Sequence, residues 1–317
     1  MGKKLRLSLI LVNVCFILLA GLFFIASAED KIRPPAAAGS FYPDSEAELP
    51  AMITKLLSNT PDEKPAGEIL AAVAPHAGYV YSGAVAAHTF KQLAEIDFDT
   101  IIIIGHDSYE NCVAFLSPAD YFKTPLGLVP VDRDMVDKMM KFNKGIISSQ
   151  SAHSQDHSVE LQLPFLQVMG KKCKIVPIMF GNPTAKNCRI LADAIIAAAG
   201  SKKVFVLSST DMSHYPSYED ARQVDNATLD MIKTMDIDKI FKHLEEQIRN
   251  RDIPDLETAM CSRGGVGTAI LFAKTKSADQ AQVLQYANSG DVSVGSRDRV
   301  VGYSSVLFIK TSAAISR

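Results

Sequence analysis

The sequence predicts a single α/β domain over about residues 32–312, in which helices cover both faces of a mostly parallel central sheet. Short, nearly continuous apolar runs, rich in β-branched residues, alternate with amphipathic stretches along the chain. Runs of this kind are typical of strands that are buried on both faces of a sheet. No internal repeat and no long linker rich in Gly, Ser or Pro divides the sequence, so we expect one domain.

The alternation of strands and helices can be followed along the chain. The predicted strands span 69–74, 100–104, 174–180, 204–207, 283–287 and 303–309. The predicted helices span 82–95, 158–169, 184–199, 218–235, 237–249 and 265–274. The helix at 184–199 has the clearest boundaries, because Thr184 follows a proline at its start and Gly200 stands at its end. Strands that alternate with helices favour parallel pairing.

Composition excludes several classes of protein. The 317 residues are 47% hydrophobic and 21% charged, which gives enough apolar material for a core and excludes a disordered chain. The formal net charge of -2 offers no basic field for nucleic acid. Five cysteines are too few for a disulfide-built scaffold. The glycine-rich and cysteine-pair motifs of nucleotide-binding, α/β-hydrolase and thioredoxin proteins do not occur.

The N-terminal residues have the pattern of an export signal. Lys3, Lys4 and Arg6 precede an apolar run at 7–25, and Ala-Ser-Ala follows at 26–28. This order predicts that residues 1–28 are a cleaved secretory signal peptide. The alternative is an uncleaved membrane anchor through residues 7–25, because the run is nearly long enough to span a bilayer. Either way, we expect the folded part outside the cytoplasm, most simply in a bacterial periplasm.

Three predicted strands each lead to a histidine. His76 follows the strand at 69–74, His106 follows 100–104, and His214 follows 204–207. The carboxyl ends of parallel strands meet at one edge of a sheet, where ligands bind. Neutral imidazole is the commonest metal ligand and the usual general base near pH 7. Each histidine alone is compatible with an ordinary loop position, but the group favours a metal or catalytic site.

A fourth histidine stands beside a carboxylate. His157 and Glu160 are three residues apart at the start of the predicted helix at 158–169, so we expect them on one face. A carboxylate there can orient a histidine or take a proton. The alternative is helix capping by Asp156 or Ser158. His153 is expected to be solvated.

Cys261 precedes the predicted helix at 265–274. A helix N-terminus lowers the pKa of a thiol and favours the thiolate. Three roles stay open for Cys261: a nucleophile, a soft metal ligand, or half of a disulfide with Cys112, Cys173 or Cys188.

Several sequence blocks stand out between Arg33 and Phe308: AGSFYP (38–43), APHAGYVYSG (74–83), TPLG (124–127), DHSVELQLPFLQ (156–167), SSTDMSH (208–214), Cys261 with its neighbours, and YAN (286–288). In this order the blocks resemble the Memo family, whose bacterial and archaeal members are often named AmmeMemoRadiSam system protein B. The resemblance covers essentially the whole chain after the predicted signal peptide.

The resemblance implies a fold similar to the class III (LigB-type) extradiol dioxygenases. Those enzymes hold a non-haem Fe(II) with two histidines and a carboxylate, and the Memo pattern has a cysteine in the third place. By this resemblance His76, His106 and Cys261 are the metal ligands. Asp211 and His214 line the same pocket, with His214 as the candidate acid/base and Asp211 as its support.

The resemblance also assigns His157 and Glu160 to the pocket's HSxE block, as candidate catalytic residues. At the second histidine the sequence departs from the family pattern, which usually reads Gly-Pro-Ser/Asn-His. Here Gly105 is followed directly by His106 and Asp107, so either residue is a candidate for the second ligand position. A set of two imidazoles and a thiolate favours iron or copper over magnesium or calcium.

Two functional classes follow from this reading. The first is a metal-dependent redox enzyme of the oxidoreductase or dioxygenase-like kind, acting on O2 or on a small organic substrate. The second is a non-catalytic protein that binds a small ligand or a peptide in the same pocket, or serves as an adaptor. No nucleic-acid partner is expected, and contact with a membrane is expected only through the N-terminal segment. The family's usual genomic company, a radical-SAM protein and an AMMECR-type protein, would be separated from an exported chain.

Overall fold

The central sheet has eight strands in the order β10-β11-β2-β9-β3-β8-β4-β7. A computed structural model describes residues 30–65, 67–250 and 253–311. The strands of the central sheet are β2 (Gly67–Ala74), β3 (Thr100–Asp107), β4 (Ala114–Leu116), β7 (Ile146–Ser148), β8 (Lys174–Phe180), β9 (Val204–Ser209), β10 (Gln280–Asn288) and β11 (Gly302–Thr311). The predicted signal peptide or anchor at 1–28 lies outside the described residues.

The four middle strands are parallel, as the sequence predicts. β2 pairs with β9, β9 with β3, and β3 with β8, all in parallel register. The flanks are antiparallel, because β11 runs opposite to both β2 and β10, and β4 runs opposite to β8. The sheet is therefore mixed but mostly parallel, and the chain after Ile32 forms one compact α/β domain.

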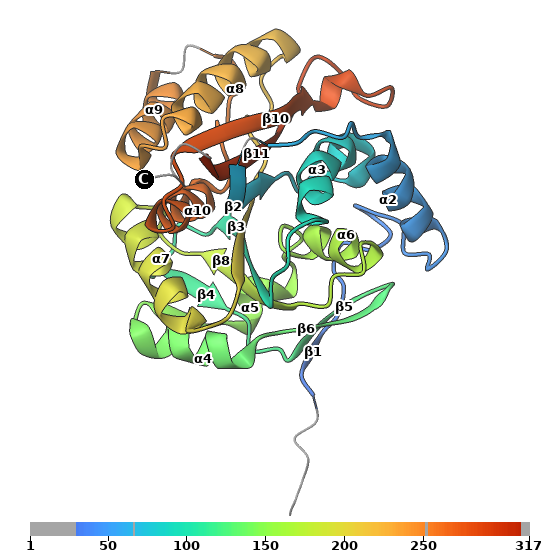
Figure 1. The fold of residues 1–317 in the computed structure, drawn as a ribbon. Helices are drawn as coiled ribbons and strands as arrows, with labels where there is room; N and C mark the ends of the chain where they lie inside the picture. The colour runs from blue at the N-terminus through green and yellow to red at the C-terminus, as the bar shows by residue number, and fades with distance from the viewer. Residues whose placement is uncertain (1–29, 66, 251–252, 312–317) are drawn as a thin grey trace, which may run out of the picture. The chain divides into compact units, whose positions relative to one another are not determined.

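Helices cover both faces of this sheet (Figure 1). On one face α10 contacts β2, β3 and β9, and α7 packs between α10 and α4. On the other face α3 contacts β2, β10 and β11, and α2 packs on α3 and α6. The longer helices are α2 (Glu48–Asn59), α3 (Tyr79–Leu93), α4 (Arg133–Phe142), α6 (Leu163–Val168), α7 (Ala185–Ala199), α8 (Tyr218–Lys233), α9 (Ile237–Asn250) and α10 (Arg263–Thr275). The short ones are α5 (Gln150–Ser154), η1 (Glu160–Gln162) and η2 (Ser289–Asp291).

Local signals explain where several helices begin and end. The Thr184 side chain accepts a hydrogen bond from the Asn187 amide, which caps α7, and Gly200 ends it with a positive φ of 57°. The helix predicted at 158–169 is instead divided into η1 and α6. Pro164 lies in the first turn of α6 and has no amide hydrogen, so it cannot continue the hydrogen bonding of the preceding turn.

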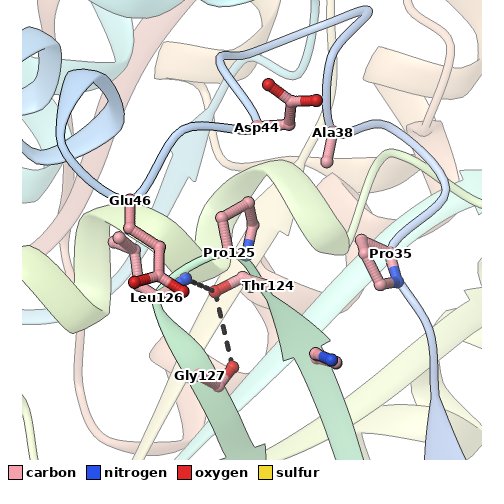
Figure 2. Close-up of a pocket in the computed structure, with 9 residues that line it drawn as sticks. Pro35, Ala38, Asp44, Glu46, Thr124, Pro125, Leu126 and Gly127 are labelled. Atoms are coloured by element: carbon pink, nitrogen blue, oxygen red, sulfur yellow. Dashed lines mark hydrogen bonds between the residues drawn. The ribbon is translucent and has the colours of Figure 1, made fainter.

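A second, three-stranded sheet holds the start of the domain. It consists of β1 (Ile32–Arg33), β5 (Tyr121–Thr124) and β6 (Gly127–Pro130), in the order β1-β5-β6. The turn between β5 and β6 and the chain after β1 enclose a hollow of about 660 Å³ that is open to solvent (Figure 2). The Thr124 hydroxyl accepts from the Leu126 amide at 3.0 Å, which stabilises this turn.

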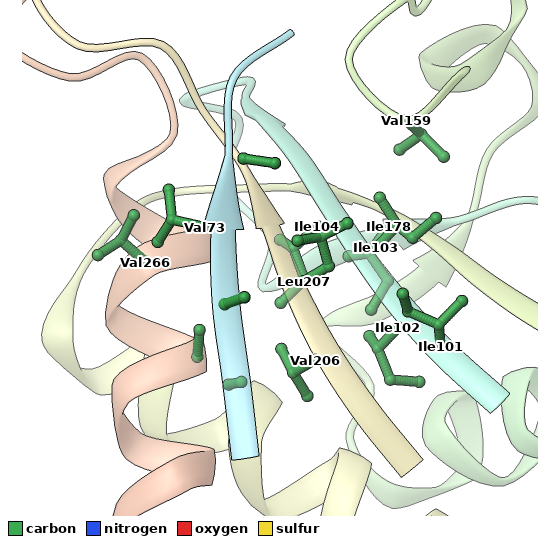
Figure 3. Packing of buried hydrophobic residues seen from close by; sticks show 14 of the residues in the cluster. Val73, Ile101, Ile102, Ile103, Ile104, Val159, Ile178, Val206, Leu207 and Val266 are labelled. Carbon is green, nitrogen blue, oxygen red and sulfur yellow. The ribbon is translucent and has the colours of Figure 1, made fainter. Parts of the chain in front are cut away.

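The core lies between β2, β9, β3 and the helices on either side (Figure 3). The four isoleucines at 101–104 are fully buried, so both faces of β3 are covered. This is why the run reads as continuously apolar rather than alternating. None of the described helices is long and apolar enough to cross a membrane.

Gly105 allows β3 to approach the loop that follows α5. A Cβ at this position would overlap the Ser158 hydroxyl, which bonds the backbone of the next residue, His106. We expect Gly105→Ala to destabilise the protein by about 1–3 kcal/mol, because either β3 or the loop must shift. Urea unfolding measures this.

The matched control is Gly83→Ala in α3, where the added methyl meets only the end of the flexible Leu56 side chain. Equal stability of the two variants would contradict the close approach at Gly105.

Candidate metal centre

Three histidines from separate parts of the chain converge at the carboxyl ends of the middle strands. His76 lies two residues after β2, His106 is the penultimate residue of β3, and His157 lies in the loop before η1. One ring nitrogen from each lies within 4.8 Å of the other two. The ring centroid of His106 is 4.4 Å from that of His76 and 4.9 Å from that of His157. We call these three residues the histidine cluster.

The strand order explains two of these positions. β2 and β3 flank β9 and run parallel to it, so the loops after β2 and β3 reach the same edge of the sheet. Ser158 holds the third histidine there. The His106 amide donates to Ser158 Oγ at 3.1 Å, and Ser158 Oγ donates to Asp156 Oδ1. The Phe41 ring stacks on His157 with centroids 4.5 Å apart.

The three imidazoles are uncharged near neutral pH. Burial is the main cause that lowers the pKa of His76 well below its usual value, and the neighbouring histidines lower it further. Burial likewise lowers the pKa of His106 to about 4, with the nearby His157 acting in the same direction. A neutral imidazole has one ring nitrogen with a free lone pair, so such a group binds a metal ion without first losing a proton.

A cavity of about 680 Å³ opens beside the histidine cluster. Its lining includes His106, Tyr109, Ile248, Met260, Cys261 and Arg263. The walls also include the charged residues Glu245, Arg249 and Glu257, so the cavity has an apolar part and a strongly polar part. Its size is suitable for a small organic molecule.

Cys261 lies against the cluster. Its Sγ is 3.4 Å from His76 Nε2 and accepts a hydrogen bond from the Asp211 amide at 3.2 Å. The expectation of a lowered thiol pKa is wrong for the protein without a metal ion. Burial, with the Asp211 carboxyl beside it, raises the pKa of Cys261 to about 12 and outweighs the helix N-terminus. The disulfide alternative is also wrong, because the four cysteines in the described part of the chain are free.

The structure separates the two candidates for the second ligand position. His106 belongs to the histidine cluster. The Asp107 carboxylate instead accepts from the Gly264 amide, with both oxygens at 3.2 Å, and so caps the start of α10. Burial raises the pKa of Asp107 to about 7.

Asp211 and His214 both lie at this edge, but they do not form a pair. Within the described ranges, the Asp211 carboxylate accepts from the His76 amide at 2.8 Å and has no bond to His214. Burial raises the pKa of Asp211 to about 7. His214 Nε2 is buried and has no hydrogen-bond partner among the residues that the structure describes. Burial, together with the nearby His106 and His157, lowers the pKa of His214 to about 4.

Glu160 anchors the N-terminal segment. Its carboxylate forms an ion pair with Arg33, and its oxygens accept from the amides of Ala36 and Ala37 at 2.7 and 3.0 Å. The Tyr42 hydroxyl is the fourth donor. A carboxylate with four protein donors is better suited to holding the fold than to moving protons.

Two residues near Glu160, His153 and Asp156, can be compared with what the sequence predicts for them. His153 is buried rather than solvated, and its Nε2 donates to the Phe115 carbonyl at 3.1 Å. Asp156 caps the following turn by accepting from the amides of Ser158 and Val159, both at 2.9 Å, which is the capping alternative. Residue-level reasoning did not single out Arg33 or Phe41. Only the resemblance includes them, Arg33 as the start of the matching region and Phe41 within AGSFYP.

Glu160→Gln should destabilise the protein strongly. The change leaves the buried Arg33 without its charged partner, and we expect a loss of about 3–5 kcal/mol. Urea unfolding measures it, with Glu246→Gln as the control because Glu246 pairs with Lys242 at the exposed surface of α9. If both variants were equally stable, Glu160 would not anchor the segment.

The raised pKa of Asp225 makes the stability of the protein depend on pH. This buried carboxylate accepts from the Ser213 amide and the Tyr286 hydroxyl, and burial raises its pKa to about 7 from the usual 3.8. The folded protein therefore keeps a proton that the unfolded chain loses, so this group's stabilising contribution falls as the pH rises from about 4 to 7.

Asparagine at position 225 cannot ionise. The stability of Asp225→Asn should therefore increase relative to that of the unchanged protein when the pH is raised from 5 to 8. Urea unfolding at both pH values measures this. A difference that is the same at both values would show that Asp225 ionises normally.

Comparisons with known proteins identify the family of the chain. Residues 33–307 match the protein family described as Memo-like protein. A "MEMO1 family protein" of Methanobrevibacter smithii is 36% identical over 295 residues, covering 87% of this chain and 99% of the relative. Relatives of the same name from Archaeoglobus fulgidus and Nitrosopumilus maritimus are 36% identical over 283 residues and 32% identical over 285 residues. These cover 87% and 88% of this chain, and 99% and 100% of the relatives. The chain belongs to the Memo family.

Proposed function

We propose that the protein binds one redox-active transition-metal ion, iron or copper, at the histidine cluster. The observation that carries this proposal is the convergence of three neutral imidazoles, with ring nitrogens within 4.8 Å of one another. Imidazole suits iron, copper and zinc, whereas magnesium and calcium prefer oxygen ligands. The Cys261 thiol beside His76 is a further soft donor in the same place.

The residues present fit such an ion. His76, His106 and His157 are held by separate elements, and burial keeps them uncharged. The Asp211 amide hydrogen points at Cys261 Sγ, an arrangement that supports a thiolate when a cation lowers its pKa. Three histidines at one side of an ion leave positions open for a ligand.

We propose that the protein is a metal-dependent oxidoreductase that uses this pocket. A bound iron or copper ion would supply one-electron chemistry with O2 or an organic substrate. The chain itself would bind a small molecule in the cavity beside His106 and Cys261. We propose His214 as the acid/base of this chemistry; its support is that His214 Nε2 is buried and has no hydrogen-bond partner among the described residues.

The second candidate function is a binding protein without turnover. It is favoured by the cavity itself, whose apolar wall of Leu244, Ile248 and Met260 would hold a small ligand or a peptide side chain. The two candidates differ in whether a loaded protein consumes O2.

We propose further that the protein is exported, with the periplasm as the simplest destination. The basic start, the apolar run at 7–25 and the Ala-Ser-Ala at 26–28 support this. An uncleaved anchor would place the domain on the same side of the membrane.

Elemental mass spectrometry of the purified, untagged protein tests the metal proposal. We expect close to one iron or copper per chain, lost in His76→Ala and His157→Ala, because two imidazoles alone hold an ion weakly. His243→Gln is the control, since His243 lies in α9 and bonds Thr228 outside the cluster.

Cys261→Ser then tests whether the ligands are the three histidines alone or include the Cys261 thiol. If the variant loses the metal, the thiol is a ligand. If it keeps the metal, the three imidazoles are sufficient. Absence of metal from the reconstituted protein would refute the proposal. A loaded protein that takes up no O2 with any substrate would favour the binding function.

A further inference from the structure

Three polar groups meet at the hydroxyl of Ser209, the last residue of β9. Ser209 Oγ lies 2.6 Å from the Ser158 carbonyl oxygen, 2.8 Å from Gln162 Nε2 and 3.0 Å from His76 Nδ1. Ser209, Gln162 and His76 are at most 1% exposed, so water does not compete for these bonds. The hydroxyl therefore joins β9, the loop after β2 and the segment that carries His157.

The direction of each bond follows from the number of protons. A serine hydroxyl has one hydrogen to donate and two positions at which it accepts. The Ser158 carbonyl has no hydrogen, so the Ser209 proton points to it. Gln162 Nε2 also lies 3.0 Å from the Pro75 carbonyl, which identifies this atom as the amide donor. Ser209 Oγ must then accept from Gln162, and it has one accepting position left.

We propose that Ser209 is a positioning residue that fixes the tautomer of His76. The remaining accepting position can be filled only by a hydrogen on His76 Nδ1, so Nε2 of the neutral ring carries the free lone pair. Nε2 is the atom that faces the site, at 3.4 Å from Cys261 Sγ and 4.0 Å from Asp211 Oδ2. In the other tautomer, two lone pairs would face each other between Nδ1 and Ser209 in the dry interior.

The consequence for metal binding rests on the function proposed above. A histidine that binds a metal commonly donates its other ring hydrogen to a protein acceptor, which sets its orientation and basicity. Ser209 supplies that acceptor for His76. The tautomer itself does not depend on any metal, and it can be measured in the metal-free protein.

The test is a long-range ¹H–¹⁵N correlation spectrum of the metal-free protein with ¹⁵N-labelled histidine. The His76 signals are assigned by their absence in His76→Gln. We expect His76 to be protonated at Nδ1, and Ser209→Ala to give the other tautomer or a mixture. The matched control is Ser208→Ala, because Ser208 is the preceding residue of β9, is fully buried, and has a hydroxyl without a hydrogen-bond partner in the described part of the chain. We expect this variant to keep the Nδ1–H tautomer.

A second measurement follows the metal. Titration with Co²⁺, as a redox-inert stand-in for iron, should show affinity about 10–100-fold lower in Ser209→Ala and unchanged in Ser208→Ala. Protonation of His76 at Nε2 in the unchanged protein would overturn the proposal, even if Ser209→Ala failed to fold. An unaltered tautomer in a folded Ser209→Ala would overturn it too. An Nδ1–H tautomer in a protein that binds no metal would uphold the role of Ser209 and refute the metal function instead.

Discussion

The structure depends on holding the segment at 156–162 against the ends of β2, β3 and β9 in the buried interior. An unpaired buried donor or acceptor costs about 1–3 kcal/mol. Asp156, Ser158 and Glu160 avoid this cost by bonding backbone amides and Arg33, and the side-chain nitrogen of Gln162 donates to Ser209. His157 lies among these four residues, so the bonds that fix the segment also fix the third histidine of the cluster.

The sequence was sufficient for the middle of the sheet and for the convergence of His76 and His106. Buried parallel strands such as β3 and β8 read as continuous apolar runs, and the topology then brings His76 and His106 to one edge. The strands β4 and β7 were missed, because three-residue strands carry little pattern. The helices α2 and α4 were also missed, although both have an amphipathic pattern that the sequence offers. The boundary at Pro164 was available in the sequence, but the helical pattern around it was the stronger signal.

What the sequence could not supply was the balance between opposing effects. The start of α10 should favour a thiolate at Cys261, yet burial beside Asp211 has the larger effect on its pKa. The polar residues beside His153 in the sequence suggested that it is exposed to solvent. Its position is instead set by Arg33, 120 residues away, whose Nε donates to the His153 carbonyl. The catalytic role predicted for His157 rests on its spacing from Glu160 and on the resemblance. Its distance from His76 and His106 depends on the packing of Ser158 against Gly105, which has no local signature.

The ion pair between Arg33 and Glu160 also orders events in time. The two residues are 127 positions apart, so the pair closes a long loop that gains nothing until the chain is present as far as Glu160. If the chain is exported as proposed, the N-terminal segment would emerge from the membrane first and would have no partner until Glu160 followed. The histidine cluster would then be completed only on the far side of the membrane, and the proposed metal ion would bind there.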